Sequence, residues 1–247
     1  MGLTLWLLVG CGQLSLWGAE PDVSGKAATN ALTRAEAGLI AARKRCATET
    51  TNSVAAWELG RACFNWGELL KDPVAQEKVY TEGVAACRRS LSLDPKSGPA
   101  HYYLGMNIGR QADLKRNLVA LGMVKDVERA FQKARELDEN FRHAGPDRNL
   151  GLLYHEAPGW PISIGNDKLA RKHLERAAKL APDYPENRLN LAEAYREWHE
   201  KKLFQRELEA IQQLWPSAKT NFTGVEWESD WADWENRRAK LGAAKSK

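Results

Sequence analysis

Two neighbouring side chains, His155 and Glu156, are the strongest candidates for chemistry in this sequence. A histidine beside a carboxylate could exchange protons with a substrate, because imidazole titrates near neutral pH, and both groups can bind metal ions. His143 and Asp147 lie upstream and could join them around the segment Ala157–Asp167. One hypothesis is therefore an enzyme or metal site that depends on His155.

The wider sequence does not favour catalysis. Its histidines lack the His-x3-His or His-Glu-x2-His spacing that places two metal ligands on one helical face. It contains neither a Gly-x-Ser-x-Gly nucleophile turn nor a phosphate-binding glycine loop followed by lysine. We therefore expect helix-capping or solvated roles for these groups, and we predict no catalytic residue, cofactor or metal. The histidines are His101, His143, His155, His173 and His199.

The segment that follows Glu156 is the most unusual stretch of the chain. Two prolines and two glycines between Ala157 and Asp167 prevent it from continuing a helix, although helical patterns flank it on both sides. It predicts a rigid aromatic loop between two helices, and such loops often carry binding residues. The candidate binding residues are Pro158, Trp160, Pro161, Ile162, Ile164 and Asp167.

Local signals indicate where the helices that position this loop begin. Residues 20–52 should contain a loose segment and then a helix that starts at the capping box of Thr33 and Glu36. Asn52 is expected to cap the next helix. Asp72 stands before a proline at the first position of a further helix, where the missing N–H costs nothing.

A helix-ending motif divides the rest of the chain into units. It consists of a leucine, a variable residue, and a proline or charged residue. The last two copies are 34 residues apart, counted from Pro182 to Pro216. The copies are Leu93-Asp94-Pro95, Leu137-Asp138-Glu139, Leu180-Ala181-Pro182 and Leu214-Trp215-Pro216.

Small and aromatic residues recur at equivalent positions of these units, where small side chains let paired helices approach closely. The packing positions are Gly60, Gly105, Gly151, Tyr154, Ala170, Ala177 and Tyr195. This pattern and its period resemble the tetratricopeptide-repeat superfamily. The resemblance implies an all-α fold, a right-handed superhelical α-solenoid of about four helix pairs over residues 53–217, with an extra helix at each end.

Three of the four units are longer than a regular repeat, always between their two helices. If these insertions are loops, they emerge on one edge of the stacked array, where such arrays often bind partners. The alternative is that the first two only lengthen helices, since residues 66–70 and 118–124 are compatible with a helix. The third insertion contains Pro158 and Pro161 and has to be a loop.

The C-terminal residues 218–247 carry three tryptophans on one helical stripe, namely Trp227, Trp231 and Trp234. The last unit of a repeat array leaves an apolar face open. We therefore expect these indoles to belong to a capping helix, which is followed by a short tail. The alternative is an aromatic patch that anchors a partner.

The N-terminal residues 1–19 carry no charge and predict an export signal or an N-terminal membrane anchor. The residues before Cys11 resemble a lipoprotein signal, which would make Cys11 the lipid-bearing residue, and cleavage after Ala19 is the alternative. We therefore expect an exported protein, either periplasmic or a membrane-attached lipoprotein of a bacterium.

Three cysteines follow this segment, at Cys46, Cys63 and Cys87. In an oxidising compartment an odd number permits one disulfide, for example between Cys63 and Cys87, and one remaining thiol. No Cys-x-x-Cys spacing indicates a zinc or redox site. We favour buried thiols at positions of helix packing.

The charge balance argues against a nucleic-acid partner, because 36 basic and 32 acidic residues are interspersed and leave a net charge of only +4. Two central blocks resemble known families. Residues Gly145–Asn187 are similar to the T-component of TRAP-type transporters, which are exported helical-repeat proteins that associate with periplasmic solute-binding subunits. Residues His101–Asn140 are similar to the helical repeats of the regulators of microtubule dynamics.

These observations predict an exported, non-catalytic scaffold that binds another protein through the inserted loops on one edge. The alternative, implied by the resemblance of residues Gly145–Asn187, is a transport accessory component that binds a solute-binding protein or holds a small apolar ligand.

Overall fold

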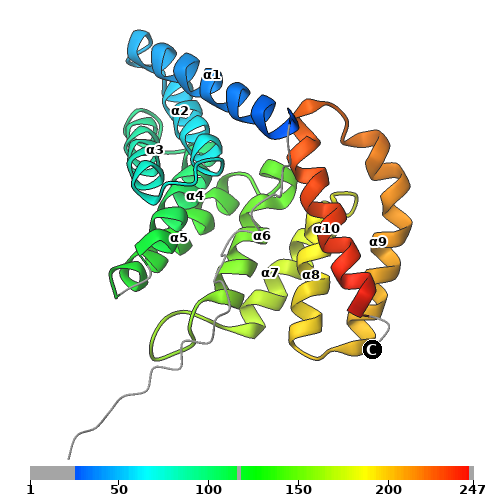
Figure 1. Cartoon of the computed structure of the whole chain (residues 1–247). Helices are drawn as coiled ribbons and strands as arrows, with labels where there is room; N and C mark the ends of the chain where they lie inside the picture. The colour runs from blue at the N-terminus through cyan, green and yellow to red at the C-terminus, as the bar shows by residue number, and fades with distance from the viewer. Residues whose placement is uncertain (1–25, 116–117, 245–247) are drawn as a thin grey trace, which may run out of the picture.

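The computed structural model describes residues 26–115 and 118–244. These residues form ten α-helices and one short 3-10 helix, and no β-strand occurs among them (Figure 1). The predicted all-α repeat fold is therefore confirmed. In chain order the helices are α1 (Lys26–Thr48), α2 (Ser53–Gly67), α3 (Pro73–Leu93), α4 (Gly98–Lys115), α5 (Leu118–Leu137), α6 (Phe141–Glu156), α7 (Asp167–Leu180), α8 (Pro185–Glu197), α9 (Lys201–Asn221), η1 (Val225–Trp227) and α10 (Glu228–Ala244).

Four helix pairs make up the array: α2 with α3, α4 with α5, α6 with α7, and α8 with α9 (Figure 1). Successive pairs stack because α3 contacts α4, α5 contacts α6, and α7 contacts α8. The core therefore extends along the array instead of forming one central cluster. Its largest cluster joins the second and third pairs through Tyr102, Phe131 and Leu150.

Capping side chains start two of these helices where the sequence predicted. The Asn52 Oδ1 atom accepts hydrogen bonds from the main-chain N–H groups of Val54 and Ala55 at the start of α2, at 2.9 and 3.4 Å. The Asp72 carboxylate accepts from Val74 and Ala75 at the start of α3. Each cap supplies acceptors to N–H groups that have no partner within the helix.

Glycines lie where the two helices of a pair cross. A Cβ atom at Gly60 would lie 2.2 Å from the Cys87 sulfur, and one at Gly105 would lie 2.8 Å from the Phe131 ring. At Gly151 it would lie 2.6 Å from the Leu174 Cγ atom. The remaining positions that the sequence assigned to repeat packing are all buried, namely Tyr154, Ala170, Ala177 and Tyr195.

The cysteines take part in the same packing. Cys46, Cys63 and Cys87 are buried free thiols, so Cys63 and Cys87 are not bridged. Burial raises the pKa of the Cys63 thiol to about 12, which keeps it protonated and unreactive at neutral pH.

Two predicted helix boundaries were wrong. Helix α1 begins at Lys26, ahead of the Thr33 capping box, because the alanine-rich residues before Thr33 contain no glycine or proline after Gly25 and favour helix. Helix α9 continues through Pro216 to Asn221. Trp215 and Ala218 are buried on the two sides of that proline, and their packing offsets the roughly 3 kcal/mol that an interior proline costs.

The first two insertions are mostly helix. Only residues 68–72 connect α2 to α3, and α4 extends to Lys115 before α5 starts at Leu118. The expectation that three units carry inserted loops is therefore corrected: the first two insertions mainly lengthen helices, as the alternative held. Ala157–Asn166 between α6 and α7 remains the one long non-helical connection within a pair in the described parts of the chain.

The two ends of the array are covered and lie close together. Trp234 of α10 is buried, and Trp227 and Trp231 pack beside it on the last helix pair, which is the arrangement expected of a capping helix. The Arg34 guanidinium of α1 donates to the Val225 main-chain oxygen at 3.3 Å and pairs with Glu228 at 3.2 Å.

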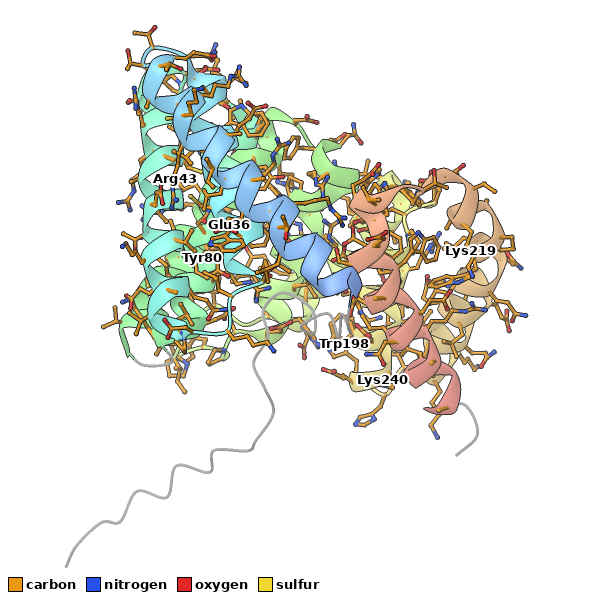
Figure 2. The ribbon with its side chains drawn as sticks, turned by 45° about the horizontal axis from the view of Figure 1, so that its top comes forward. Glu36, Arg43, Tyr80, Trp198, Lys219 and Lys240 are labelled. Atoms are coloured by element: carbon orange, nitrogen blue, oxygen red, sulfur yellow. The ribbon has the colours of Figure 1, made fainter. Side chains whose placement is uncertain are left out.

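Helix α1 is attached to the first pair through Arg43, which is labelled in Figure 2. The Arg43 guanidinium donates two hydrogen bonds to the Glu82 carboxylate of α3. Within the described ranges, no helix combines the length and the apolar composition that a membrane span needs. Residues 1–19, with the proposed export signal, the lipidation candidate Cys11 and the cleavage position Ala19, lie outside the described residues.

Candidate functional site

The loop between α6 and α7 is braced by its own backbone. The Gly165 N–H donates to the Pro158 oxygen at 2.9 Å, and the Asn166 N–H donates to the Tyr154 oxygen at 2.8 Å. A Cβ atom at Gly165 would lie 2.0 Å from the Ala157 oxygen, so this close approach requires glycine. Asn166 then caps α7 by accepting from the N–H groups of its first turn. The loop therefore has a defined shape.

The bracing presents two large apolar side chains to solvent. Trp160 is 88% exposed and Ile162 is 65% exposed. Pro158 precedes Trp160, Pro161 lies between Trp160 and Ile162, and both prolines are exposed as well. Ile164 differs from the other candidates, because it is half-buried and packs against the core cluster of the second and third pairs. Its contact with the core holds the loop in place.

Asp167, the last of the candidate loop residues, is the first residue of α7 and is exposed. A carboxylate there interacts favourably with the positive end of the helix dipole. This placement gives Asp167 a helix-stabilising role that is independent of binding.

The residues that could have formed a catalytic group do not converge. The His155 Nε2 atom lies 2.9 Å from the Glu197 carboxylate on α8, and the His155 ring packs edge-on against Trp198. Asp147 lies eight residues before His155 on the same helix, which separates the two residues by about 12 Å along the helix axis. No group of three or more potential metal ligands occurs in the part of the chain that the structure describes.

Glu156 has an unusual environment. Burial, together with the nearby carboxylates of Asp113 and Glu197, raises its pKa to about 9. Its Oε2 atom is buried without a hydrogen-bond partner among residues 26–115 and 118–244. Glu156 is therefore protonated at neutral pH, and its neighbour His155 interacts with Glu197 instead.

Asp147 is completely buried and belongs to an ion cluster with α7. Its carboxylate lies 2.7 Å from the His173 Nδ1 atom and 3.0 Å from the Arg176 Nε atom. Arg176 also binds Glu139. This cluster ties the two helices of the third pair together, and burial at this contact explains why Asp147 is not available as a ligand.

A left-handed backbone turn precedes this region at the start of α6. Arg142, His143 and Ala144 have φ values of 50°, 57° and 60°. Left-handed helical geometry costs a non-glycine residue about 1–2 kcal/mol, so three in succession need compensating contacts. Such strained backbone is found most often where function requires it, or where the surroundings determine it fully.

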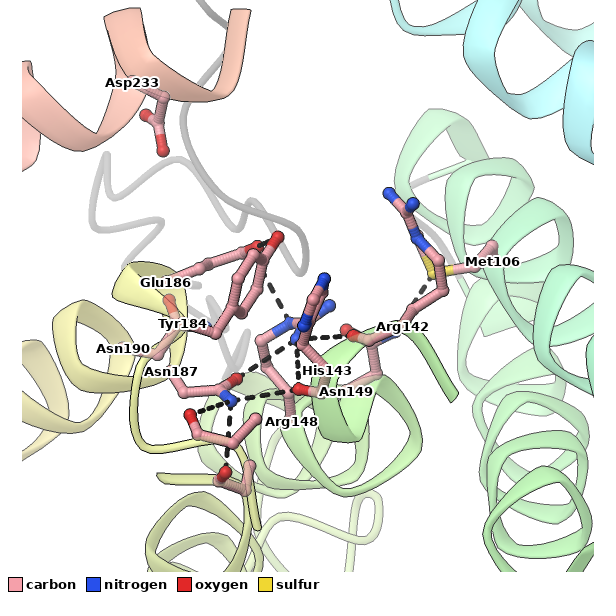
Figure 3. Close-up of polar contacts among 12 residues, drawn as sticks. Met106, Arg142, His143, Arg148, Asn149, Tyr184, Glu186, Asn187, Asn190 and Asp233 are labelled. Atoms are coloured by element: carbon pink, nitrogen blue, oxygen red, sulfur yellow. Dashed lines mark hydrogen bonds and ion pairs between the residues drawn. The ribbon is translucent and has the colours of Figure 1, made fainter. Parts of the chain in front are cut away.

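Two buried polar side chains supply those contacts (Figure 3). The Arg148 Nη1 atom donates to the main-chain oxygens of Arg142 and His143 at 3.3 and 3.2 Å, and to the Asn187 side-chain oxygen at 3.1 Å. The Asn187 Nδ2 atom donates to the His143 oxygen at 3.0 Å and to the Ala177 oxygen at 3.1 Å. Side chains of α6 and α8 therefore hold the turn, and the contact with Ala177 anchors Asn187 to α7.

Aromatic packing completes the cluster. The His143 ring stacks on Tyr184 with centroids 4.4 Å apart, and the Arg148 guanidinium lies over the same Tyr184 ring. Burial, with the nearby Arg148 and Arg142 charges, lowers the pKa of His143. A neutral His143 fits this stacked position between the third and fourth helix pairs.

This cluster was not found by sequence reasoning. The signal available in the sequence was a run of three polar residues within a predicted helix, Asp147, Arg148 and Asn149. The structure shows that all three are buried. Buried polar residues need partners, and here the partners come from other helix pairs. The cluster connects the third and fourth pairs, so we interpret it as structural, and we regard the exposed loop as the candidate binding site.

Comparison with known protein families finds a match for the first part of the chain. Residues 27–144 match the family model described as "Regulator of microtubule dynamics protein 1-3". The matching segment runs from α1 to the left-handed turn and agrees with the resemblance seen at His101–Asn140. No curated protein matches the chain.

Proposed function

We propose that this protein is an exported, non-catalytic scaffold of tetratricopeptide type that binds another protein through the Ala157–Asn166 loop. The observation that carries the proposal is the loop itself: it is braced internally, yet it exposes Trp160 almost fully and Ile162 by about two thirds. Tryptophan is enriched among residues that dominate binding energy, and a braced loop loses little entropy on binding. The family match ends at residue 144, ahead of this loop, so the proposal rests on the loop and not on the match.

The alternative, a transport accessory component that holds a small apolar ligand, has weaker support. A hollow between α9 and α10, lined by Leu208, Ile211 and Leu241, has a volume of about 180 Å³. Ligand sites usually enclose about 300–1,000 Å³, so this hollow is small for such a ligand. Binding of a solute-binding protein would use the same exposed loop and is included in the proposal.

Site-specific crosslinking in native cell envelopes tests this function. A photoreactive amino acid at position 160 of the full chain should form an adduct with a discrete protein. The matched control is the same amino acid in place of Lys179, which is exposed at the opposite end of α7. Adducts that form only from position 179, or none from position 160, would contradict the proposal.

A further inference from the structure

The side of the array where the two helices of each pair are joined exposes large apolar side chains to solvent. We call it the loop edge; it comprises the connections 68–72, 157–166 and 198–200, and the facing ends of α4 at Lys115 and α5 at Leu118. The three most exposed large apolar side chains of the described residues lie on it or in the first helical turn beside it. They are Trp160 at 88%, Val74 at 76% and Ile162 at 65%.

Lysines with no partner lie on the same edge as Trp160, near the starts of α7 and α9. Lys168 and Lys172 are in the first two turns of α7, and Lys201 and Lys202 are in the first turn of α9. All four are exposed, and their ammonium groups form no hydrogen bond or ion pair with any residue that the structure describes. Their charges are therefore available to a partner.

These two groups of lysines lie side by side. The Arg171 guanidinium of α7 is 2.8 Å from the Glu200 carboxylate, in the connection between α8 and α9. The same guanidinium lies 5.1 Å from the Trp198 ring centroid. The first turns of α7 and α9 are thus held together beside the base of the loop.

The acidic groups of the loop edge are mostly neutralised. Glu77 pairs with Lys115 at 2.7 Å, and Glu200 pairs with Arg171. Glu197 binds His155, and the raised pKa of Glu156 keeps it uncharged at neutral pH. Asp72 and Asp167 are exposed and have no basic partner among the residues described, but the four unpaired lysines outnumber them, so the charge left over at this edge is positive.

The opposite edge has no such group of lysines, because the helices that begin there, α4, α6 and α8, carry none in their first two turns. Its connections between successive pairs carry Asp94, Asp138 and Asp183. Lys96 is the one lysine among residues 94–97, 138–140 and 181–184.

We propose that the partner of the loop edge is a protein with an acidic surface, whose carboxylates surround an apolar pocket for Trp160. This inference rests on the proposed function and adds the chemistry of the partner. The free lysines steer and orient an acidic partner, because charges of opposite sign accelerate encounter and disfavour wrong partners. The indole then supplies the apolar contact at the centre, shielded from water by its surroundings.

Charge neutralisation tests the proposal on the full chain in native envelopes. The photoreactive amino acid is placed at position 162, so that Trp160 is retained, and the yield of protein adduct is measured. The variant Lys168→Gln/Lys201→Gln/Lys202→Gln should reduce this yield roughly tenfold. The matched control Lys44→Gln/Lys96→Gln/Lys179→Gln removes the same charge at exposed positions on the opposite edge and should leave the yield unchanged.

Competitors identify the chemistry of the partner. Poly-L-glutamate and salt at about 0.5 M should lower the adduct yield, since both screen or occupy the lysines, whereas poly-L-lysine should not. An equal yield from the two triple variants would overturn the acidic partner and leave the scaffold function intact. Crosslinking to phospholipid, or competition by vesicles of phosphatidylglycerol and phosphatidylcholine, would overturn it in favour of a membrane surface. Failure to form any protein adduct from position 162 or 160 would contradict the scaffold function itself.

Discussion

The side-chain nitrogen of Asn187 lies 3.0 Å from the main-chain oxygen of His143. This contact joins α8 to the left-handed turn at the start of α6, and the same nitrogen lies 3.1 Å from the Ala177 oxygen near the end of α7. Asn187 is only 1% exposed. One amide therefore links the third and fourth helix pairs and satisfies carbonyl groups that water cannot reach.

Asn187→Ala should destabilise the protein by about 1–3 kcal/mol, because it leaves buried carbonyl groups without a donor and removes a brace of the strained turn. Urea unfolding followed by circular dichroism measures the change. Asn221→Ala, at the exposed end of α9, is the matched control and should change stability by less than about 0.5 kcal/mol. Similar effects of the two substitutions would show that the brace has no energetic role.

Gly151→Leu should destabilise by about 1–3 kcal/mol or more, since even a Cβ atom there would lie 2.6 Å from Leu174 Cγ and 3.0 Å from the Leu174 main-chain nitrogen. Gly38→Ala in α1 is the control, because a Cβ atom there has no neighbour within 4 Å. It should stabilise by up to about 1 kcal/mol through helix propensity. Thermal unfolding of both variants checks the opposite signs, and a neutral Gly151→Leu would refute the close crossing of α6 and α7.

Trp160→Ala and Trp234→Ala should differ sharply in stability. Trp160 is 88% exposed, so its loss should change the free energy of unfolding by less than about 0.5 kcal/mol. Trp234 is 1% exposed, and its loss should cost about 3–5 kcal/mol. Melting temperatures of the two variants provide the measurement. A large loss of stability with Trp160→Ala would make the loop part of the architecture.

Glu156→Gln should stabilise the protein at neutral pH. The pKa of Glu156 is about 9 in the folded state, against about 4.3 for an unperturbed glutamate. The folded state therefore binds the extra proton between these values, and this residue makes stability fall as the pH rises through that window. Glutamine imitates the protonated form, so the variant should gain at least about 1 kcal/mol at pH 8 and lose part of the pH dependence.

Glu197→Gln is the control for that experiment, because its effect should have the opposite sign. The hydrogen bond with His155 lowers the pKa of Glu197, so the charged carboxylate stabilises the fold above its unfolded pKa and the contribution is lost as the pH falls. Its neutralisation should therefore lower stability at neutral pH. Unfolding curves between about pH 5 and pH 9 separate the two variants. If Glu156→Gln also lowers stability, the carboxyl group is charged in the folded state.

Much of the fold follows from short-range chemistry that is visible along the chain. Asn52 and Asp72 cap helices because their side chains reach N–H groups only two or three residues away. The α6–α7 loop is equally local, since proline and glycine limit their own backbone. Gly60 and Gly105 were recognised through their repeated spacing, which reflects a helix crossing that recurs in each pair.

Other features depend on contacts between residues far apart in the chain. Pro216 signals a helix end, yet burial of Trp215 and Ala218 carries α9 through it. The left-handed turn at His143 exists because Asn187, 44 residues away, supplies its hydrogen bond. Likewise, only the folded arrangement shows that Glu200 forms an ion pair with Arg171 while Lys168 stays unpaired. Helix type and register thus come from local chemistry, whereas strain, burial and free charge are set when the pairs pack, because their compensating partners come from other helices.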